Sequence, residues 1–429
     1  MTQLRLGIAG LGTVGIGVME LLRDNAALVK ARTGKDIVVT AVSSRDKTRD
    51  RGVSLDGIDW HDDARNLAKA DNVDVVLELI GGSEGIAKDV CEIALSAGKD
   101  VVTANKALIA HHGAALGKNA GDNGASLLFE AAVAGGIPVI KTLREGLAAN
   151  EIKSVMGILN GTCNYILTEM EKTGRGFEDV LSEAQEKGYA EADPSFDVGG
   201  IDAAHKLVIM ASLAFGVAPT MDDLFIEGIE HITYEDIMFA RDLGYSIRLI
   251  GITKPTDTGV ERRMHPCLVP ADSPLGQVDD VFNAVQIDAH PVDSIFLEGR
   301  GAGAGPTASS VMADVMDIAR DVKVPIFGIV NSSLKSESFS SMDSVVSRYY
   351  LRLSVEDRAG VMAAITKELE KADISVETLV QPPHDKTAAA QIVLTTHETT
   401  EQNMRLALDR LAALDVVKEK PQLIRIEQS

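Results

Sequence analysis

The sequence predicts an α/β protein in three parts: a doubly wound parallel sheet, a mixed α+β domain, and a small C-terminal domain of ferredoxin-like order. Three observations lead to this fold class. Short apolar runs alternate with helical segments near the N-terminus, the pattern changes from about Val139, and a serine-rich stretch from Asn331 to Ser347 precedes a last set of elements. At 429 residues the chain is long enough for each part to bury its own core.

Five short apolar runs define the predicted parallel sheet. Longer segments with helical spacing separate them, which is the sequence pattern of repeated strand–helix–strand units. The runs are Leu4–Ala9, Ile37–Ser43, Val73–Ile80, Asp100–Ala104 and Ser126–Glu130. We expect this first domain to cover residues 1–130 and to be rejoined by residues 305–325, with the second domain over residues 131–304.

The rest of the chain changes character twice. Ile152–Leu159 is predicted as a strand and Gly200–Phe215 as a long buried helix, so the second domain mixes both kinds of element. Residues 331–347 are rich in serine and poor in large apolar side chains, which predicts a linker. Residues 348–429 follow the order strand, helix, strand, strand, helix, strand, over Tyr349–Val355, Val361–Ala372, Ile374–Val380, Ala389–Thr395, Thr400–Ala413 and Leu423–Ile426.

Composition and charge exclude several classes of function. Asp and Glu total 63 against 42 for Lys and Arg, and the formal charge of −21 repels nucleic acid and anionic membranes. The longest apolar stretch, Leu207 to Pro219, is shorter than the ~20 residues of a membrane-spanning helix. Three cysteines without Cys-x-x-Cys spacing, and an N-terminus without the pattern of a signal peptide, predict a cytoplasmic protein without disulfides.

A glycine-rich loop follows the first predicted strand. Gly10, Leu11, Gly12, Thr13, Val14 and Gly15 form the pattern Gly-x-Gly-x-x-Gly, and a helical segment begins there. Gly10 permits the tight turn, Gly12 lets the backbone approach a pyrophosphate, and Gly15 permits close helix–strand packing, while the helix N-terminus attracts negative charge. The sequence therefore predicts a Rossmann fold that binds a nicotinamide dinucleotide.

The end of the second predicted strand bears on the choice between NAD(H) and NADP(H). A fold specific for NAD(H) places an acid there, roughly 20 residues beyond the loop. This strand instead ends in Val42-Ser43-Ser44-Arg45-Asp46, about 30 residues beyond Gly15. The Arg45 guanidinium can hold a 2′-phosphate through two hydrogen bonds, so we expect a preference for NADP(H), with NAD(H) as the second possibility. A solvated Arg45 without a ligand is nearly as compatible with the pattern.

Several ordered motifs go beyond a general dehydrogenase. They are Thr103-Ala104-Asn105-Lys106, Gly157-Ile158-Leu159-Asn160-Gly161-Thr162, Gly188-Tyr189-Ala190-Glu191-Ala192-Asp193-Pro194, Gly199-Gly200-Ile201-Asp202-Ala203-Ala204-His205-Lys206, and Gly299-Arg300-Gly301-Ala302-Gly303 with Pro306-Thr307-Ala308. With them the chain resembles homoserine dehydrogenase from its first strand to about Arg320, and the tail from Tyr349 resembles the ACT domain appended to many bacterial members. The resemblance implies reversible reduction of L-aspartate 4-semialdehyde to L-homoserine, in the biosynthesis of threonine, methionine and isoleucine.

Lys206 is the predicted proton donor. A hydride that reaches an aldehyde carbon leaves negative charge on the oxygen, so the site needs an acid or a cation beside it. Asp202 and Lys206 are four residues apart and share one face at the polar end of a buried helix. The family motif makes Lys206 catalytic with Asp202 as its partner. Lys106, at the carboxyl edge of the sheet, shares the catalytic role and contacts the cofactor. Judged alone, Asp202 and Lys206 are also compatible with an ordinary helix salt bridge.

The resemblance also implies the residues that bind substrate and cofactor. Glu191 matches the family's glutamate for the ammonium group of the substrate, and Asp197 and Asp202 belong to the same polar cluster. Asn160, Gly161 and Thr162 are implied to contact nicotinamide and substrate, and Gly303 the cofactor. The Asn-Gly-Thr segment suits a plain turn and helix cap as well.

A metal site is implied after the last predicted strand of the sheet. The segment from Glu130 to Ile137 matches one that can bind a monovalent cation in this family. The implied ligands of a structural sodium ion are the side chain of Glu130 and the carbonyls of Val133, Gly135 and Ile137. The histidines, by contrast, show no spacing with cysteines or carboxylates that suits a metal.

The tail is expected to be regulatory. Glu356-Asp357-Arg358-Ala359-Gly360-Val361 joins its first strand to its first helix and resembles the ligand loop of ACT domains. In the family L-threonine commonly binds and inhibits, and paired ACT domains join subunits, which implies feedback regulation and a homodimer or homotetramer. A domain that joins subunits but has lost its ligand is the alternative.

Two other functions compete with the dehydrogenase. Another nicotinamide oxidoreductase with an ACT tail, such as a hydroxy-acid dehydrogenase, should show a catalytic set of Arg, Glu and His, which is not evident in the sequence. A non-catalytic amino-acid sensor on a nucleotide-binding fold is less compatible with the presence of Lys106, Glu191, Asp202 and Lys206.

Overall fold

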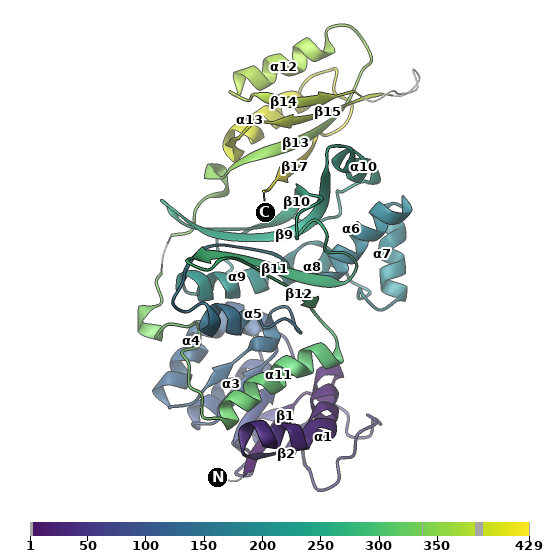
Figure 1. Cartoon of the computed structure of the whole chain (residues 1–429). Helices are drawn as coiled ribbons and strands as arrows, with labels where there is room; N and C mark the ends of the chain where they lie inside the picture. Colours follow the sequence, from purple (N-terminus) through teal and green to yellow (C-terminus); the bar gives the residue numbers. More distant parts are fainter. Residues whose placement is uncertain (1–2, 337, 382–388, 429) are drawn as a thin grey trace.

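Three parts of the chain are stacked along the long axis of the molecule (Figure 1). The computed structural model describes residues 3–336, 338–381 and 389–428. The N-terminal parallel sheet and its helices lie at one end, a mixed sheet with helices lies in the middle, and the C-terminal domain lies at the other end. The predicted fold class is confirmed.

The N-terminal sheet has six parallel strands in the order β3-β2-β1-β4-β5-β6. The strand order reverses between β1 and β4, and in such sheets ligands bind at the carboxyl ends of the strands beside this switch point. Each of the five predicted runs overlaps one strand, whereas β3 is only three residues long and was not predicted. The strands are β1 (Gln3–Ala9), β2 (Asp36–Ser43), β3 (Asp59–His61), β4 (Val75–Glu78), β5 (Asp100–Thr103) and β6 (Leu127–Leu128).

Five helices are packed with this sheet, and the last of them comes from far along the chain. They are α1 (Thr13–Thr33), α2 (Ala64–Lys69), α3 (Ile86–Ser96), α4 (Lys106–Asp122) and α11 (Ala304–Ala319). Val18 and Leu22 of α1 share one apolar core with Val311 and Val315 of α11, so the chain returns to the N-terminal domain after the middle one.

The middle part packs helices against a mixed sheet. Its strands are β7 (Glu151–Ile158), β8 (Phe225–Ile226), β9 (Tyr245–Thr256), β10 (Gly259–Pro270), β11 (Phe282–His290) and β12 (Asp293–Arg300). Its helices are α5 (Val139–Lys141), α6 (Gly161–Thr173), α7 (Phe177–Glu186), α8 (Ser195–Val198), α9 (Ile201–Phe215) and α10 (Tyr234–Asp242). The predicted buried helix is α9, and it contacts β7, β9 and β10 while every residue from Asp202 to Leu213 is buried. A helix that is apolar almost all round is stable only inside the protein, which fixes α9 under the sheet.

The C-terminal domain has the predicted order of elements and one additional short strand, β16. The elements are β13 (Val346–Val355), α12 (Val361–Lys371), β14 (Val376–Val380), β15 (Ala390–Thr396), β16 (Thr399–Thr400), α13 (Glu401–Ala412) and β17 (Gln422–Ile426). Strand β17 pairs in parallel with β10 at Cys267–Arg425 and Leu268–Ile426. This pairing joins the middle and C-terminal sheets into one sheet of 11 strands.

The segment predicted as a linker lies along the middle domain. The Lys335 carbonyl accepts a hydrogen bond of 3.0 Å from the Ala218 N–H, and the Ser340 N–H donates to the Val260 carbonyl at 3.1 Å. The described residues of this connection are therefore attached to the middle domain by backbone hydrogen bonds.

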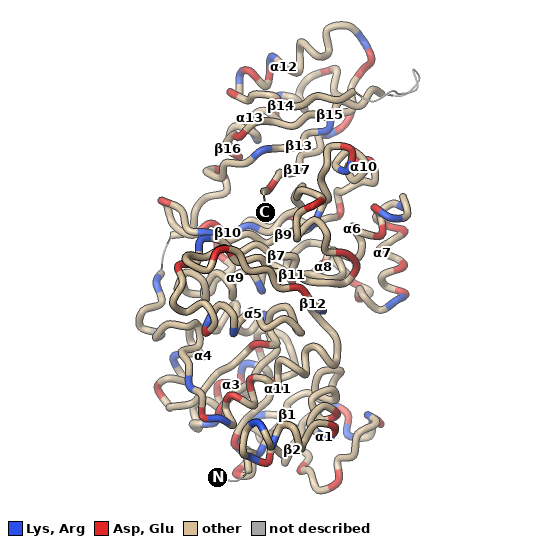
Figure 2. Tube along the Cα trace, in the orientation of Figure 1, with Lys and Arg blue, Asp and Glu red and all other residues tan. Residues whose placement is uncertain are grey.

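Acidic and basic side chains are interspersed along the whole trace (Figure 2), and the acidic ones outnumber the basic ones by 63 to 42. Among residues 3–336, 338–381 and 389–428, we find no helix whose length and hydropathy would let it span a bilayer.

Candidate active site

The glycine-rich loop between β1 and α1 lies at the switch point of the parallel sheet. Gly10 has a φ of +112°, and a Cβ atom there would lie 2.5 Å from the Leu79 carbonyl oxygen. A Cβ atom on Gly15 would lie 2.2 Å from the Gly10 carbonyl oxygen, whereas one on Gly12 would meet nothing within 4 Å. Gly10 and Gly15 are thus required by the turn and its packing, and Gly12 leaves open the space that a pyrophosphate needs before the N-terminus of α1.

A cavity of about 790 Å³ extends from this loop past the end of β2. Arg45, Arg49 and Arg51 line it. Arg51 donates hydrogen bonds to the carbonyls of Arg49 and Asp46, and its guanidinium carbon lies 5.5 Å from the centre of the Trp60 ring. The cavity therefore offers cationic groups where the ribose next to the adenine would lie in a Rossmann fold. Sequence reasoning found Arg45 but missed Arg49 and Arg51, because only the folded loop brings them back to the strand end.

Asp46 is the acid nearest to the end of β2, and its carboxylate is already engaged. Its Oδ1 accepts hydrogen bonds from the hydroxyl and the backbone N–H of Thr48 at 2.7 and 2.8 Å. These hydrogen bonds lower the pKa of Asp46. The local turn thus uses the carboxylate that a ribose hydroxyl would otherwise need.

Lys206 projects from the buried helix α9 toward the end of β7. Its Nζ donates to the Leu159 carbonyl at 2.6 Å and to Asp202 Oδ2 at 2.7 Å. Lys106, the first residue of α4, places its Nζ 3.0 Å from Asp202 Oδ1. One carboxylate thus holds two ammonium groups, one from each of the two domains. Burial alone would raise the pKa of Asp202, but Lys206 and Lys106 outweigh it and hold that pKa well below its usual range.

Asn160 joins this cluster from the turn between β7 and α6. Its Oδ1 accepts a hydrogen bond of 2.8 Å from the Cys163 N–H and caps α6. Its Nδ2 donates to Asp202 Oδ2 at 2.9 Å and to Asp197 Oδ1 at 2.8 Å. Burial raises the pKa of Asp197, although the hydrogen bond from Asn160 opposes the rise. The same side chain therefore caps the helix and orients two carboxylates.

Glu191 lies on the exposed segment between α7 and α8. The Thr162 hydroxyl donates to the Tyr189 carbonyl at 2.7 Å, and Gln185 Nε2 donates to the Glu191 carbonyl at 3.0 Å. The Tyr189 ring packs edge-on against Tyr165 with 5.1 Å between ring centres. These contacts attach the backbone of the segment to α6 and α7, at the rim of the cavity that the lysines border.

This second cavity has a volume of about 590 Å³ and lies between the N-terminal and middle domains. The predicted residues that line it are Val14, Lys106, Gly135, Asn160, Gly161, Thr162, Glu191, Asp197, Asp202, Lys206 and Gly303. Gly10, Leu11, Gly12 and Arg45 line the larger cavity, while Thr13 and Gly15 lie within the first turn of α1. The predicted catalytic and substrate residues therefore meet around the second cavity, whereas the predicted cofactor residues are divided between the two cavities.

Other lining residues were not predicted. Tyr189, Arg300 and Thr307 stand inside motifs that sequence reasoning had marked, but no role was assigned to them. Asn283 lies on β11, in a stretch where no motif gave a signal.

Comparisons with known proteins agree with this geometry. Residues 138–316 match the family model described as homoserine dehydrogenase, residues 10–130 match its NAD-binding domain, and residues 349–416 match the ACT domain. The chain is 43% identical to homoserine dehydrogenase of Neisseria gonorrhoeae over 433 residues, which cover 100% of this chain and 99% of the relative. The chain belongs to the homoserine dehydrogenase family. Its predicted activity as an NAD(P)-dependent oxidoreductase is thereby confirmed.

Further homoserine dehydrogenases are similar over their whole length. That of Pseudomonas aeruginosa is 42% identical, with 100% of both chains covered. The crystal structure of a homoserine dehydrogenase from Thiobacillus denitrificans gives a TM-score of 0.94 at 41% identity, covering 99% of this chain and 98% of that chain. These relatives favour neither a hydroxy-acid dehydrogenase nor a non-catalytic sensor.

The residues that the homoserine dehydrogenase resemblance implies as metal ligands are buried. Glu130, Val133 and Ile137 are each at most 2% exposed. The Glu130 carboxylate accepts hydrogen bonds from the backbone N–H groups of Ile140 and Lys141 at 3.0 and 2.8 Å. Burial and the neighbouring Asp314 raise the pKa of Glu130 to about 8. Asp314 Oδ1 is itself buried without a hydrogen bond among the described residues, although the Lys141 amine lies 3.7 Å away. A cation would therefore offset unsatisfied negative charge here.

The carbonyls assigned to the same site have partners of their own. The Gly135 carbonyl accepts a hydrogen bond of 2.5 Å from the Ser310 hydroxyl, and the Ile137 carbonyl accepts one of 2.8 Å from the Val139 N–H. Each oxygen has a second lone pair. The donor set suits a hard cation that shares its ligands with these hydrogen bonds.

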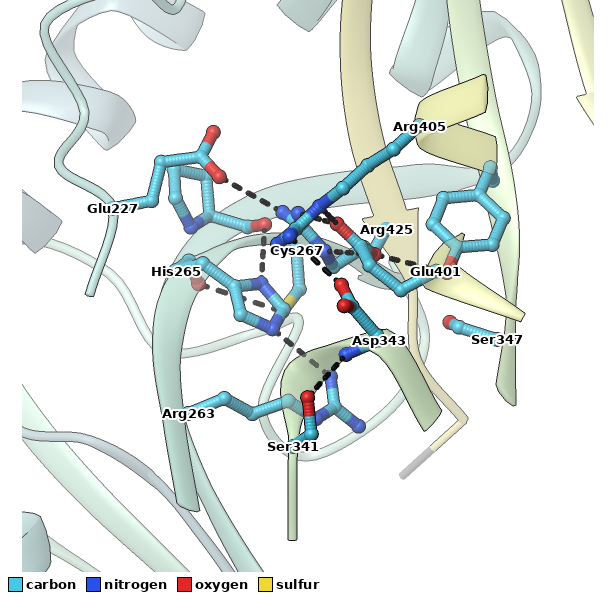
Figure 3. A network of polar contacts seen from close by, with 12 residues as sticks. Glu227, Arg263, His265, Cys267, Ser341, Asp343, Ser347, Glu401, Arg405 and Arg425 are labelled. Atoms are coloured by element: carbon cyan, nitrogen blue, oxygen red, sulfur yellow. Dashed lines mark hydrogen bonds and ion pairs between the residues drawn. The ribbon is translucent and has the colours of Figure 1, made fainter. Parts of the chain in front are cut away.

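A network of polar contacts attaches the C-terminal domain to the middle domain (Figure 3). Arg425 Nε and Nη2 donate to the two oxygens of Glu401 at 2.9 and 2.5 Å, and its Nη1 donates to Glu227 at 2.9 Å. Arg263 Nη1 donates to Glu427 Oε1 at 2.5 Å. Both arginines are almost fully buried, at 3% and 1% exposure. Ion pairs inside the protein thus supplement the two-residue pairing of β10 with β17.

His265, Cys267 and Glu427 lie within the same network, with ligand atoms within 4.8 Å of one another. The sequence had given no sign of this cluster, since Glu427 is remote from the other two residues. Arg263 Nη1 lies 2.9 Å from His265 Nε2. Burial, and then the charges of Arg425 and Arg263, lower the pKa of His265. Positive charge therefore already occupies the place that a metal ion would need, and we assign the cluster to structure.

Proposed function

We propose that Lys206 is the proton donor to the substrate oxygen and that Asp202 and Lys106 hold the charge around it. The observation that carries this proposal is the shared Asp202 carboxylate at the crevice between the two domains, 2.7 Å from Lys206 Nζ and 3.0 Å from Lys106 Nζ. When bound, the reduced nicotinamide supplies the hydride. The aldehyde oxygen then needs a proton, and a cationic amine beside it stabilises the developing negative charge.

The contacts of Lys206 support this role. An ammonium group has three protons, and the Leu159 carbonyl and Asp202 accept two of them. The third is available toward the cavity that Lys206 lines. In the reverse direction the neutral amine accepts the hydroxyl proton of homoserine. The Glu191 carboxylate binds the substrate ammonium, with Asp197, Asn160, Gly161 and Thr162 around the rest of the molecule.

The deciding experiment is Lys206→Ala with full kinetics. Removal of a general acid of this kind lowers kcat by about 10³-fold, while the folded protein and its affinity for NADPH are retained. Lys153→Ala is the matched control, because Lys153 is a half-exposed lysine whose ion pair among the described residues is with Glu151. Retained turnover in Lys206→Ala would remove the assignment.

We also propose that NADP(H) is the preferred cofactor. Arg45, with Arg49 and Arg51 beside it, offers cationic groups suited to a 2′-phosphate. An archaeal homoserine dehydrogenase whose structure was solved in complex with NADPH is similar to this chain, at 26% identity over 73% of this chain and 97% of that one, with a TM-score of 0.64.

L-threonine is the proposed effector of the ACT domain. Gly360 opens α12 with a φ of +92°, and a Cβ atom there would meet nothing within 4 Å, which leaves room for a small amino acid against the backbone. We propose that the effect reaches the active site through Glu227. Arg425 binds this residue, and the Ile229 N–H two residues on donates to the Val198 carbonyl just before α9. Inhibition by millimolar threonine, with matching binding in calorimetry, is the expected result, and unaltered kinetics would leave a purely structural ACT domain.

The remaining proposals concern assembly and the cation. We expect a cytoplasmic homodimer or homotetramer joined through ACT domains, which light scattering tests. We expect domain boundaries at residues 1–130 rejoined by 305–325, 131–304 and 348–429. A structural sodium ion at Glu130, Val133, Gly135 and Ile137 would raise the unfolding temperature in sodium relative to a large organic cation at equal ionic strength, and identical curves would argue against it.

A further inference from the structure

One buried side chain of the active-site crevice is left without a partner in the part of the chain that the structure describes. Asn283 is 1% exposed, and its Nδ2 makes no hydrogen bond. It lines the cavity that Lys206 and Asp202 border. Buried amide donors are almost always paired, because a buried donor without an acceptor has lost its hydrogen bonds to water and lowers the stability of the fold. A donor of this kind in a ligand cavity indicates that the ligand supplies the acceptor.

The backbone around Asn283 is shaped to hold its carboxamide in place. A Cβ atom on Gly301 would lie 2.1 Å from Asn283 Oδ1 and 2.6 Å from Nδ2, so only glycine permits the observed position. A Cβ atom on Gly161 would lie 3.5 Å from the same oxygen. The carboxamide is therefore enclosed between the second glycine-rich loop and the Asn160–Thr162 turn.

We infer that Asn283 Nδ2 donates a hydrogen bond to the carboxamide oxygen of the nicotinamide. The inference rests on the placement of the nicotinamide beside Lys206 proposed above. Lys206 and Lys106 are available to bind the negatively charged oxygen atoms of the substrate and intermediate. The neutral Asn283 amide is better suited to a neutral acceptor, such as a carboxamide oxygen. The cavity that Asn283 lines also has small or apolar residues in its wall, among them Val14, Ala104 and Gly303, and such residues suit a flat ring. By holding the carboxamide, Asn283 fixes which face of the ring meets the substrate.

The test uses the full-length protein and two cofactors that differ in one atom. Thio-NADPH has sulfur, a weak acceptor, in place of the carboxamide oxygen. Trp60 is the single tryptophan of the chain and lies beside the cofactor cavity, where Arg51 stacks on it, so energy transfer from Trp60 reports binding. Wild-type protein should bind NADPH about 5- to 20-fold more tightly than thio-NADPH, since one hydrogen bond is weakened. Equal dissociation constants in the wild type would overturn the inference without any variant.

Asn283→Leu removes the donor with little change in volume. We expect the dissociation constant for NADPH to rise about 5- to 20-fold, the preference over thio-NADPH to disappear, and the KM for aspartate semialdehyde to stay within about twofold. A rise in that KM with unchanged NADPH binding would assign Asn283 to the substrate instead, and unchanged binding of both would make it a structural residue. If the proposed proton donor is wrong but this contact is right, the assignment of Lys206 fails in its own kinetic test while the dissociation constants for NADPH and thio-NADPH still respond to Asn283→Leu. The two proposals can therefore fail separately.

Gly301→Ala supplies a second, independent variant. The new methyl group displaces the Asn283 carboxamide, so this variant should weaken NADPH binding about as much as Asn283→Leu. A further variant, Asn283→Ala, removes the carboxamide and leaves room for the new methyl group. In the Asn283→Ala background the same glycine substitution should add less than about twofold, because the displaced group is already gone. Fully additive effects would contradict the position of Asn283 over Gly301.

Discussion

Two junctions hold the three parts of this molecule together, and they use charge differently. At the first, between the N-terminal and middle domains, Lys106 and Asp202 approach to 3.0 Å beside a cavity of about 590 Å³. The Lys106 side chain remains 32% exposed there, and Asn283 lacks a partner among the described residues. Some hydrogen-bond donors of this junction, including Asn283 Nδ2, are therefore available to a ligand.

At the second junction, between the middle and C-terminal domains, the charged groups satisfy one another. Arg425 is bound by Glu401 and Glu227, and Arg263 by Glu427. Satisfied networks of this kind rigidify a contact, whereas unsatisfied polar groups mark a place where something binds. The same residue types therefore attach domains at one junction and are available for chemistry at the other, according to whether each polar group already has its hydrogen-bonding partners.

The strongest way to break the second junction is Arg425→Leu. The substitution leaves the fully buried Glu401 with only the partly exposed Arg405 as a cationic partner among the described residues, and removal of one partner of a buried ion pair costs about 3–5 kcal/mol of the free energy of unfolding. Chemical denaturation followed by circular dichroism measures this loss. At a temperature where the variant is folded, kcat should stay near the wild-type value.

Arg405→Leu is the matched control for that experiment. Arg405 Nε donates to the same Glu401 at 3.2 Å, but its side chain is 44% exposed. Exposed pairs contribute less than about 1 kcal/mol. Equal losses in the two variants would contradict the view that burial, rather than the number of ion pairs, attaches the C-terminal domain.

The first junction is broken by Asp202→Asn. The variant keeps the shape of the side chain but leaves Lys206 and Lys106 facing each other without the carboxylate, so kcat/KM should fall by about 10²- to 10³-fold. The free energy of unfolding should change less than in Arg425→Leu, because Lys206 and Lys106 line a cavity in which water can solvate them. Asp36→Asn, in an exposed pair with Lys30, serves as the control. If Asp202→Asn were strongly destabilised but fully active, the first junction would serve attachment and not chemistry, which would contradict this account.

Much of the fold followed from periodicity and glycine motifs. The five runs of the parallel sheet, the buried helix α9 and the order of the C-terminal elements were all predictable, because each has a local pattern. Strand β10 was not predictable in detail. Glu261, Arg262 and Arg263 are consecutive charges in it and all are buried. The partner of Arg263 is Glu427, 164 residues further along, and no local pattern can indicate such a pair.

The candidate site divides in the same way. Lys106, Lys206 and Glu191 were found because they stand in motifs with a chemical reason for each residue type. Asn283, Arg49 and Arg51 were missed, because their importance comes from what lies around them in space. An asparagine on a strand is a candidate only when its unpaired donor and the glycine beneath it are seen together.

His205 gives the first junction a pH dependence. It lies on α9 with its ring 5.3 Å from that of His111 on α4, and burial, then His111 and Lys106, lower the pKa of His205 to about 4. An unfolded histidine has a pKa near ~6.5, so below that pH the unfolded state takes up a proton that the native state refuses. The free energy of unfolding therefore falls as the pH drops from about 6.5 toward about 4.

His205→Gln should remove about 1–3 kcal/mol of that fall between neutral pH and pH ~4.5, measured by denaturation at both values. His397→Gln, at an exposed histidine of the C-terminal domain, should leave the fall unchanged. His265 in the second junction is also buried with a lowered pKa, so part of the dependence persists in the His205 variant. Identical pH dependence in His205→Gln and wild type would contradict this account.

The smallest effect is expected at the cofactor cavity, where Arg45 is proposed to bind the 2′-phosphate of NADPH. Arg45→Ala should raise the KM for NADPH by about tenfold and leave the KM for NADH unchanged, because only NADPH carries the 2′-phosphate that a guanidinium binds. Arg65→Ala is the control within the same cavity, since Arg65 is already engaged by Asp63 and Asp89. If both variants change the ratio of the KM for NADPH to the KM for NADH equally, the summed charge of the cavity attracts the cofactor, and the Arg45 contact does not decide the preference. If neither does, Arg45 is solvated and the preference must come from Arg49 or Arg51, which the same pair of measurements on Arg49→Ala then tests.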